Sequence, residues 1–144
     1  MNVSVPFTVE QAKKLKAGDV VNISGVIYTA RDAAHKRMLE EYDKTGKFPF
    51  DIYNQIVYYA GPAPAKPNEV IGSVGPTTSY RMDAYSPVLL RFGLRGMIGK
   101  GIRNNEVIQA MKQYTGVYFG ATGGAGALLT KHIESVEVIA YEDL

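Results

Sequence analysis

Three cationic side chains of this sequence stand at turns where the backbone could come close to a small anion. Arg31 follows an apolar segment and precedes a predicted helix, and Arg81 follows the hydroxyl-rich run Gly75-Pro76-Thr77-Thr78-Ser79. Lys100 stands between two glycines. Two arginines and a lysine could neutralise a dianion, and a guanidinium group suits a carboxylate because it donates two parallel hydrogen bonds. These residues therefore predict an anion-binding site.

Each of these residues also has a purely structural interpretation. Arg31 could be solvated at a helix start, and the hydroxyls of residues 77–79 could simply cap a helix. Lys100 could lie in a surface turn. His35, one helical turn after Arg31, is of a type more often structural than catalytic. The density of hydroxyl and cationic groups over residues 75–81 favours the anion site, since a helix start also offers free backbone N–H groups.

The sequence offers cations and hydroxyls but no obvious catalytic acid, so it looks like half of an active site. The chain has no cysteine. This excludes a cysteine nucleophile, a disulfide scaffold and an iron–sulfur cluster held by thiolates of this chain alone. The glycine-rich loop at residues 120–126 lacks the third glycine of a dinucleotide fingerprint, because Leu129 stands there. It is interpreted as a tight turn, or as backbone amides facing a ligand or partner.

Length and composition are those of an ordinary globular domain. The 144 residues favour one domain, with 46% hydrophobic and 21% charged residues. With 16 basic and 14 acidic residues, the net charge of +2 is too balanced for nucleic-acid binding. No apolar stretch of about 18 residues predicts a membrane span, and no signal peptide is recognisable. A cytoplasmic protein is expected.

The elements that must position these residues can be predicted from periodicity and turn residues. Thr8 and Gln11 have the spacing of a capping box, which predicts a helix to about residue 17. β-Branched residues predict a strand over residues 20–28, with Gly25 marking a bulge or a close backbone approach. A helix is expected over 32–45, ending at Gly46. Residues 51–60 predict a strand covered on both faces.

The second half of the chain continues the alternation of strands and helices. Three prolines predict a stiff loop over residues 61–67. The further elements expected are a strand over 69–74, a helix from the turn at 75–79 to about 92, a helix from Asn104 or Asn105 to about Tyr114 ended by Gly116, a strand over 117–119, a helix over 127–133 and a strand over 136–141. This order predicts the α/β class with a mixed sheet.

Three runs carry a resemblance to a known family: Ile27–His35, Gly75–Asp83 and Met97–Gly101. In this order, and over nearly the whole chain, they resemble the β subunit of class I iron–sulfur fumarate hydratase, which is the C-terminal domain in single-chain members. L(+)-tartrate dehydratase β subunits are close relatives. The resemblance implies that residues 1–144 form a single swivelling β/β/α domain, with a mixed sheet flanked by helices.

The resemblance further implies a hydro-lyase that reversibly hydrates fumarate to L-malate and works only with an α subunit. By position in the motifs, Arg31, Arg81 and Lys100 would bind the substrate carboxylates. Thr77 would be the base for the C3 proton, with Lys100 also in the catalytic set. A threonine base needs help, because its alkoxide is scarce unless cations favour it. Lys100 or Arg81 could supply that help, or Thr77 could work through a relay.

The same resemblance implies a division of labour between subunits. A 4Fe-4S cluster would be held by three cysteines of the α subunit, in an assembly of two α and two β subunits, and this chain would bind no metal. The general acid would also come from the α subunit. Tyr80 departs from the family pattern, which has a small residue there. An L(+)-tartrate dehydratase β subunit and a non-catalytic dicarboxylate-binding module are the alternatives.

Overall fold

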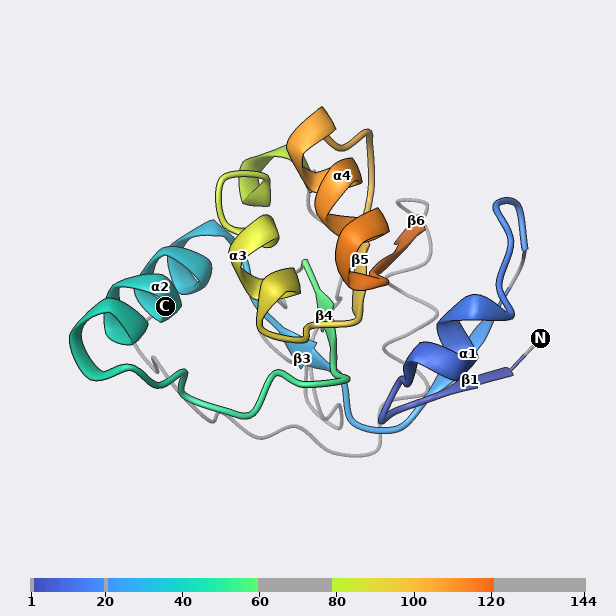
Figure 1. Ribbon diagram of the computed structural model, residues 1–144, viewed down its shortest axis with the longest axis horizontal. Helices are drawn as coiled ribbons and strands as arrows, with labels where there is room; N and C mark the ends of the chain where they lie inside the picture. Colours follow the sequence, from blue (N-terminus) through green and yellow to red (C-terminus); the bar gives the residue numbers. More distant parts are fainter. Residues whose placement is uncertain (1, 20, 60–78, 121–144) are drawn as a thin grey trace, which may run out of the picture.

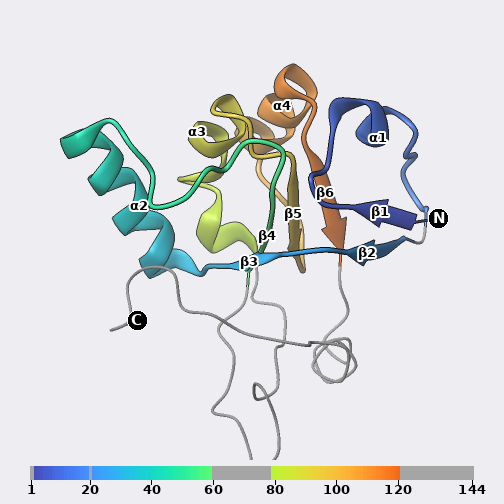
Figure 2. The same ribbon diagram turned by 90° about the horizontal axis from the view of Figure 1, so that it is seen from below.

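Two parallel β-sheets organise the residues that the computed structural model describes, which are 2–19, 21–59 and 79–120. The larger sheet has the order β3 (Tyr28–Thr29), β4 (Ile56–Tyr58), β5 (Gly96–Gly99) and β6 (Val117–Gly120). The smaller sheet pairs β1 (Asn2–Ser4) with β2 (Asn22–Ser24). All pairs of the larger sheet are parallel, so its strands end at one common edge (Figure 2).

Helices cover one face of the larger sheet. The helix α2 (Asp32–Thr45) follows β3, and α4 (Asn105–Tyr114) joins β5 to β6. Between them along the chain come the 3-10 turn η1 (Ser79–Met82) and α3 (Ser86–Arg91), which packs beside α4 (Figure 1). The short helix α1 (Val9–Lys13) lies by the smaller sheet.

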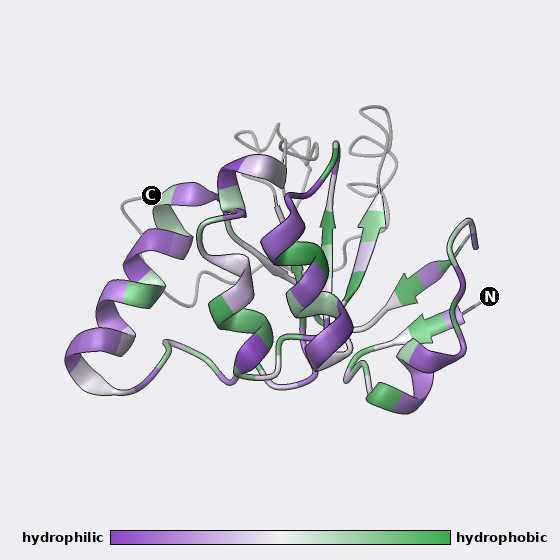
Figure 3. Cartoon of the chain, turned by 45° about the horizontal axis from the view of Figure 1, so that its top comes forward, coloured by the Kyte–Doolittle hydropathy of each residue, from purple (hydrophilic) through white to green (hydrophobic). Residues whose placement is uncertain are grey.

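The core is divided by strand β4, whose residues are all buried. Val57 and Tyr59 contribute to a cluster beneath the helices, which also holds Met38, Leu89, Leu90, Leu94 and Met97. Ile56 and Tyr58 contribute to a cluster on the opposite side, with Val3, Phe7 and Ile98. Figure 3 shows hydrophobic residues concentrated on the central strands and hydrophilic residues on the outer turns of the helices. The prediction that this strand is covered on both faces is confirmed, but the strand itself spans only Ile56–Tyr58 and not the predicted 51–60.

Several predicted boundaries agree with the structure. The helix predicted over 32–45 is α2, and Gly46 ends it in the left-handed conformation at φ 74°. Asn104 caps α4, its side chain accepting a hydrogen bond from the Val107 N–H. Thr8 caps α1 in the same way by accepting from the Gln11 N–H. These boundaries were predictable because capping depends on residues close in sequence.

The strand predicted over residues 20–28 is wrong as a single element. β2 and β3 belong to different sheets, and Gly25 lies between them with φ 116°. A Cβ atom on Gly25 would lie 3.2 Å from the Val5 Cβ. The glycine therefore permits both the change of direction and a close approach, where the hydrophobic pattern alone predicts one continuous strand.

The helix predicted to run from the turn at 75–79 to residue 92 is also wrong as one element. The described part of it consists of η1 and α3, separated by a turn. Pro87 stands in the first turn of α3, where its missing N–H costs nothing. In a continuous helix the same proline would lose a hydrogen bond and clash with the preceding turn.

Two helix ends differ from prediction. The helix α1 ends at Lys13, with Lys14 as its cap, rather than near residue 17. Thr115, not Gly116, adopts the left-handed conformation after α4, at φ 57°. Gly116 has a different function, because a Cβ there would lie 2.6 Å from Leu90 Cδ2. A side chain at this position would therefore require the end of the Leu90 side chain to move, while the Gly116 N–H donates to the Met111 carbonyl oxygen at the helix end.

The α/β class is confirmed, while other predictions fall outside the described residues. Every strand pair within 2–19, 21–59 and 79–120 is parallel, so the antiparallel pairing of a mixed sheet is not found there. Outside these ranges lie the predicted loop 61–67, the strands 69–74 and 136–141, the helix 127–133, the loop beyond Gly120, and Thr77 with Thr78. Among the described helices, none is long and apolar enough to cross a membrane.

Candidate active site

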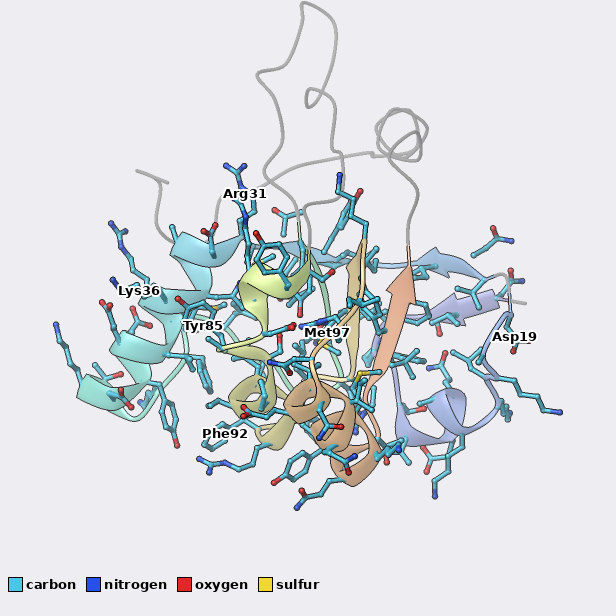
Figure 4. All side chains as sticks on the ribbon, turned by 90° about the horizontal axis from the view of Figure 1, so that it is seen from above. Asp19, Arg31, Lys36, Tyr85, Phe92 and Met97 are labelled. Atoms are coloured by element: carbon cyan, nitrogen blue, oxygen red, sulfur yellow. The ribbon has the colours of Figure 1, made fainter. Side chains whose placement is uncertain are left out.

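The three predicted cations stand at the carboxyl edge of the larger sheet or on the turn attached to it. Arg31 is the cap residue of α2, just beyond the end of β3. Lys100 directly follows β5, and Arg81 lies in η1. All three residues are exposed. Figure 4 shows the Arg31 side chain directed away from the body of the molecule, on the side where the arrows of β5 and β6 end.

Backbone and side-chain hydrogen bonds attach η1 to the end of β5. The Ser79 N–H donates to the Lys100 carbonyl oxygen over 2.9 Å. The Tyr118 hydroxyl donates to the Gly101 carbonyl oxygen over 2.9 Å and lies 2.7 Å from Ser79 Oγ. Because a carbonyl oxygen only accepts, the Tyr118 proton goes to Gly101 and the Ser79 hydroxyl donates to Tyr118. The turn that carries Arg81 is thus attached beside Lys100.

Arg31 is held at the same edge of the sheet by the neighbouring strands β3 and β4. The Ala30 N–H donates to the Tyr58 carbonyl oxygen over 3.0 Å, which extends the pairing of β3 with β4 up to Arg31. The helix that Arg31 begins is in contact with η1. In the part of the chain that the structure describes, no ion pair or side-chain hydrogen bond occupies the cationic groups of Arg31, Arg81 and Lys100. The described residues thus leave these three groups without an anionic partner.

His35 is fully buried and contacts the backbone at Arg31. Its Nδ1 lies 2.8 Å from the Arg31 carbonyl oxygen, so Nδ1 carries the proton and donates it. Its Nε2 is buried without a hydrogen-bond partner among the described residues. Burial lowers the pKa of His35 to about 4, with the positive charge of Arg103 acting in the same direction. His35 is thus neutral at pH 7 and supports the backbone of Arg31.

A buried polar network lies under the site and was not predicted from the sequence. Arg103 donates from Nε to Asp83 Oδ1 over 2.7 Å, and from Nη2 to Ser86 Oγ over 2.7 Å and to the Tyr59 hydroxyl over 3.2 Å. Its guanidinium carbon lies 5.1 Å from the ring centres of both Tyr59 and Tyr118. Burial raises the pKa of Tyr59, which keeps its hydroxyl protonated. No local pattern could have revealed this network, because its members are distant in sequence.

The chemistry available from the described residues is carboxylate binding. Two exposed arginines and a lysine, held by three separate segments, can bind a ligand that carries two carboxylates. Within the described ranges, no group of three His, Cys, Asp or Glu residues could hold a metal ion. Thr77 lies outside those ranges, and the catalytic part assigned to Lys100 remains a prediction.

A parallel α/β sheet with exposed cationic side chains near its strand ends defines the general class of this protein. Over residues 1–144 the sequence matches the family described as "Fumarase C-terminus". The chain belongs to this family. The family expected from the three sequence runs is therefore confirmed.

Individual relatives are similar over most of this chain. It is 40% identical over 141 residues to "Putative fumarate hydratase class I" of Geobacillus stearothermophilus, covering 95% of this chain and 26% of the relative. It is 38% identical over 140 residues to "Putative L(+)-tartrate dehydratase subunit beta" of Methanocaldococcus jannaschii, covering 95% and 72%. It is 37% identical over 126 residues to "Fumarate hydratase class I, aerobic" of Escherichia coli K12, covering 86% and 23%. The chain thus spans about a quarter of these fumarate hydratases but most of the tartrate dehydratase subunit.

Proposed function

We propose that this chain is the β subunit of a two-subunit hydro-lyase that reversibly hydrates fumarate to L-malate. The observation that carries the proposal is the hydrogen bond from the Ser79 N–H to the Lys100 carbonyl. Together with the contact between α2 and η1, it gathers segments bearing Arg31, Arg81 and Lys100 at one sheet edge. Positive charge on three segments at one edge suits a dicarboxylate, and the family membership supports one with four carbons.

The proposed reaction needs positive charge at the substrate carboxylates. Removing the C3 proton of malate places negative charge on the adjacent carboxylate as the transition state forms. Guanidinium and ammonium groups that are already in position stabilise that charge without reorganising, most strongly when water is excluded. Arg31, Arg81 and Lys100 are proposed to supply this stabilisation and to orient the substrate.

Thr77 is proposed as the base that removes the C3 proton. Its support is its place in the motif shared with the family, two residues before Ser79, whose backbone is bonded to Lys100. A threonine hydroxyl is a very weak acid, so a neighbouring cation must favour its ionised form. Lys100 is proposed for this second function, which places it in both the binding and the catalytic set.

The remaining parts of the enzyme are proposed to come from a partner. An iron–sulfur cluster requires thiolate ligands, and this chain has no cysteine, so its residues do not fit the 4Fe-4S cluster expected for a class I enzyme. An α subunit is proposed to hold the cluster and to supply the general acid, in an assembly of two α and two β subunits. Residues 1–144 are proposed to adopt the swivelling β/β/α fold as a single domain.

L(+)-tartrate dehydration is the second candidate function. The chain covers 72% of the relative named as a tartrate dehydratase β subunit, against 26% and 23% of the two fumarate hydratases. Both substrates are C4 dicarboxylates, and a site discriminates weakly against one added hydroxyl. A dicarboxylate-binding module without chemistry is the third candidate.

One experiment separates these candidates. The chain is co-expressed with the cysteine-bearing α subunit encoded in the same genome, purified without oxygen and assayed in parallel with L-malate, fumarate and L-tartrate. We expect turnover of malate and fumarate by the complex and none by the isolated chain. Faster turnover of tartrate would select the second candidate. Dicarboxylate binding without turnover by a cluster-loaded complex would select the third, and turnover by the chain alone would refute the need for a partner.

A further inference from the structure

The buried ion pair of Asp83 with Arg103 joins the two segments that carry Arg81 and Lys100. We propose that this pair is a positioning device, which sets the spacing of these two cations for a substrate with two carboxylates. The inference rests on the proposed function for the identity of that substrate. Neither residue touches the substrate in this scheme, so both act through the segments they join.

Both oxygens of the Asp83 carboxylate bind the segment after Lys100. Oδ1 accepts from Arg103 Nε over 2.7 Å, and Oδ2 accepts from the Asn104 backbone N–H over 2.9 Å. Asn104 is also the cap residue of α4. The carboxylate therefore connects the turn after η1 to the start of α4 at two consecutive residues. Asp83 and Arg103 side chains are 8% and 2% exposed, so water does not compete for these bonds.

The same two segments are joined a second time, on the other side of Arg81. Ser79 donates from its backbone to the Lys100 carbonyl oxygen over 2.9 Å. Arg81 thus lies between Ser79 and Asp83, and both of these residues are hydrogen-bonded to the segment that begins at Lys100. One bond alone would allow the turn to pivot, whereas two bonds four residues apart restrict its orientation. The orientation of this turn decides where the Arg81 guanidinium meets a ligand bound at Lys100.

The energetics of the pair favour positioning over simple stabilisation. Burying two charges costs a large desolvation free energy, and apolar residues of similar volume often stabilise a core as well or better. What a charged pair adds is direction, because each bond has a preferred geometry. Arg103 has further directional partners in Ser86 Oγ and the Tyr59 hydroxyl. The guanidinium plane is consequently fixed, and so is the carboxylate bonded to it.

Arg95, at the opposite end of β5, provides a matched control. Arg95 directly precedes β5, and Arg103 follows it. The two residues are similarly buried, with Arg95 5% and Arg103 7% exposed. It bonds Asn54 Oδ1 and the carbonyl oxygens of Tyr114 and Thr115 at the end of α4, away from the sheet edge that bears the cations. Replacing either arginine removes a buried hydrogen-bonding group, but only Arg103 is joined to the segment of Arg81.

The test compares D83N, R103K and R95K in the assembled enzyme, with E40Q as a surface control. Glu40 pairs with Lys36 on α2, and both side chains are largely exposed. We expect D83N, R103K and R95K all to lower the melting temperature. Only D83N and R103K are expected to lower kcat/KM, by about ten- to a hundredfold, because a small misplacement of orienting groups has effects of this size. The KM for malate is expected to rise in these two variants, and E40Q is expected to match the wild type.

Hydrogen exchange gives a readout that does not depend on turnover. In D83N and R103K the backbone amides of Ser79 and Asn104 are expected to exchange faster, while R95K leaves both near the wild-type rate. Normal kcat/KM in a destabilised D83N enzyme, or unchanged exchange at Ser79, would overturn the inference. Should D83N fail to fold, R103K carries the test because it keeps the charge. If the wild-type complex turns over no C4 dicarboxylate, only the proposed function is refuted. The hydrogen-exchange comparison still tests whether the ion pair positions the two segments.

Discussion

The Ser79 N–H donates to the carbonyl oxygen of Lys100 over 2.9 Å, and this bond attaches the turn bearing Arg81 to the end of β5. Gly99 makes the approach possible. A Cβ atom on Gly99 would overlap Ser79 Oγ and would lie 2.9 Å from Tyr59 Cδ2. Ser79 Oγ has little freedom to move away, because it is bonded to the Tyr118 hydroxyl at 2.7 Å.

The first prediction follows from this contact. Replacing Gly99 with alanine should lower the free energy of unfolding by about 1–3 kcal/mol, because the added methyl group overpacks a buried site. Gly120, its partner across the sheet, is the control: a Cβ there meets nothing within 4 Å. Chemical denaturation should therefore show G120A within about 0.5 kcal/mol of wild type. Equal effects of the two substitutions would contradict the close approach at Gly99.

The second prediction concerns the guanidinium group of Arg81. Lysine keeps the charge but loses the planar fork that pairs with a carboxylate. In the assembled enzyme, R81K should lower kcat/KM at least about tenfold, equivalent to roughly 1.4 kcal/mol of transition-state binding. R91K is the control, because Arg91 is exposed at the end of α3 and contacts the Phe92 ring. Wild-type kinetics for R81K would leave Arg81 with no function in binding.

The third prediction tests the proposed base. Valine at Thr77 keeps the shape of the side chain but removes the hydroxyl, so turnover should fall by about 10²–10⁴-fold, as for a lost proton-transfer group. The affinity for malate should change little. Exchange of the malate C3 proton with deuterated solvent should slow by the same factor. T78V is the matched control. If T78V rather than T77V abolishes exchange, the base is Thr78.

The fourth prediction concerns pH and the buried ring of His35. Its pKa is about 4 in the folded chain, against an ordinary value of 6.5, so the unfolded state binds more protons between these values. The contribution of His35 to stability should therefore fall as the pH drops below about 6.5 and should level off near pH 4, with a loss of about 3 kcal/mol.

The H35N variant isolates this contribution. Asparagine has no titratable group, and its amide can still donate to the Arg31 carbonyl. Carboxylates titrate in both proteins, so the difference between the two curves of unfolding free energy against pH belongs to His35. We expect wild type to lose its advantage over H35N as the pH falls. Parallel curves between pH 7 and pH 4 would show that the ring is not buried in its neutral form.

Local signals in the sequence predicted the elements that depend on neighbouring residues. The helix over 32–45 with its end at Gly46, and a helix start at Asn104 or Asn105, were predictable because capping is settled within a few residues. The placement of Arg31 and Lys100 just beyond strand ends also followed from the order of elements, whereas ligand binding by the three cations stays a prediction. Conversely, the break at Gly25 and the division between η1 and α3 depend on contacts that no short window contains.

Residue types and their order were enough to determine that the chain is an α/β protein, that it lacks thiolate ligands, and that Arg31, Arg81 and Lys100 are its candidate anion-binding groups. Only the tertiary structure decided how their segments meet. Parallel pairing brings the ends of β3 and β5 to one edge, and Asp83 reaches Arg103 across twenty residues of sequence. The order of side chains determines local conformational preference. Contacts between residues distant in sequence form only when the chain packs into one tertiary arrangement.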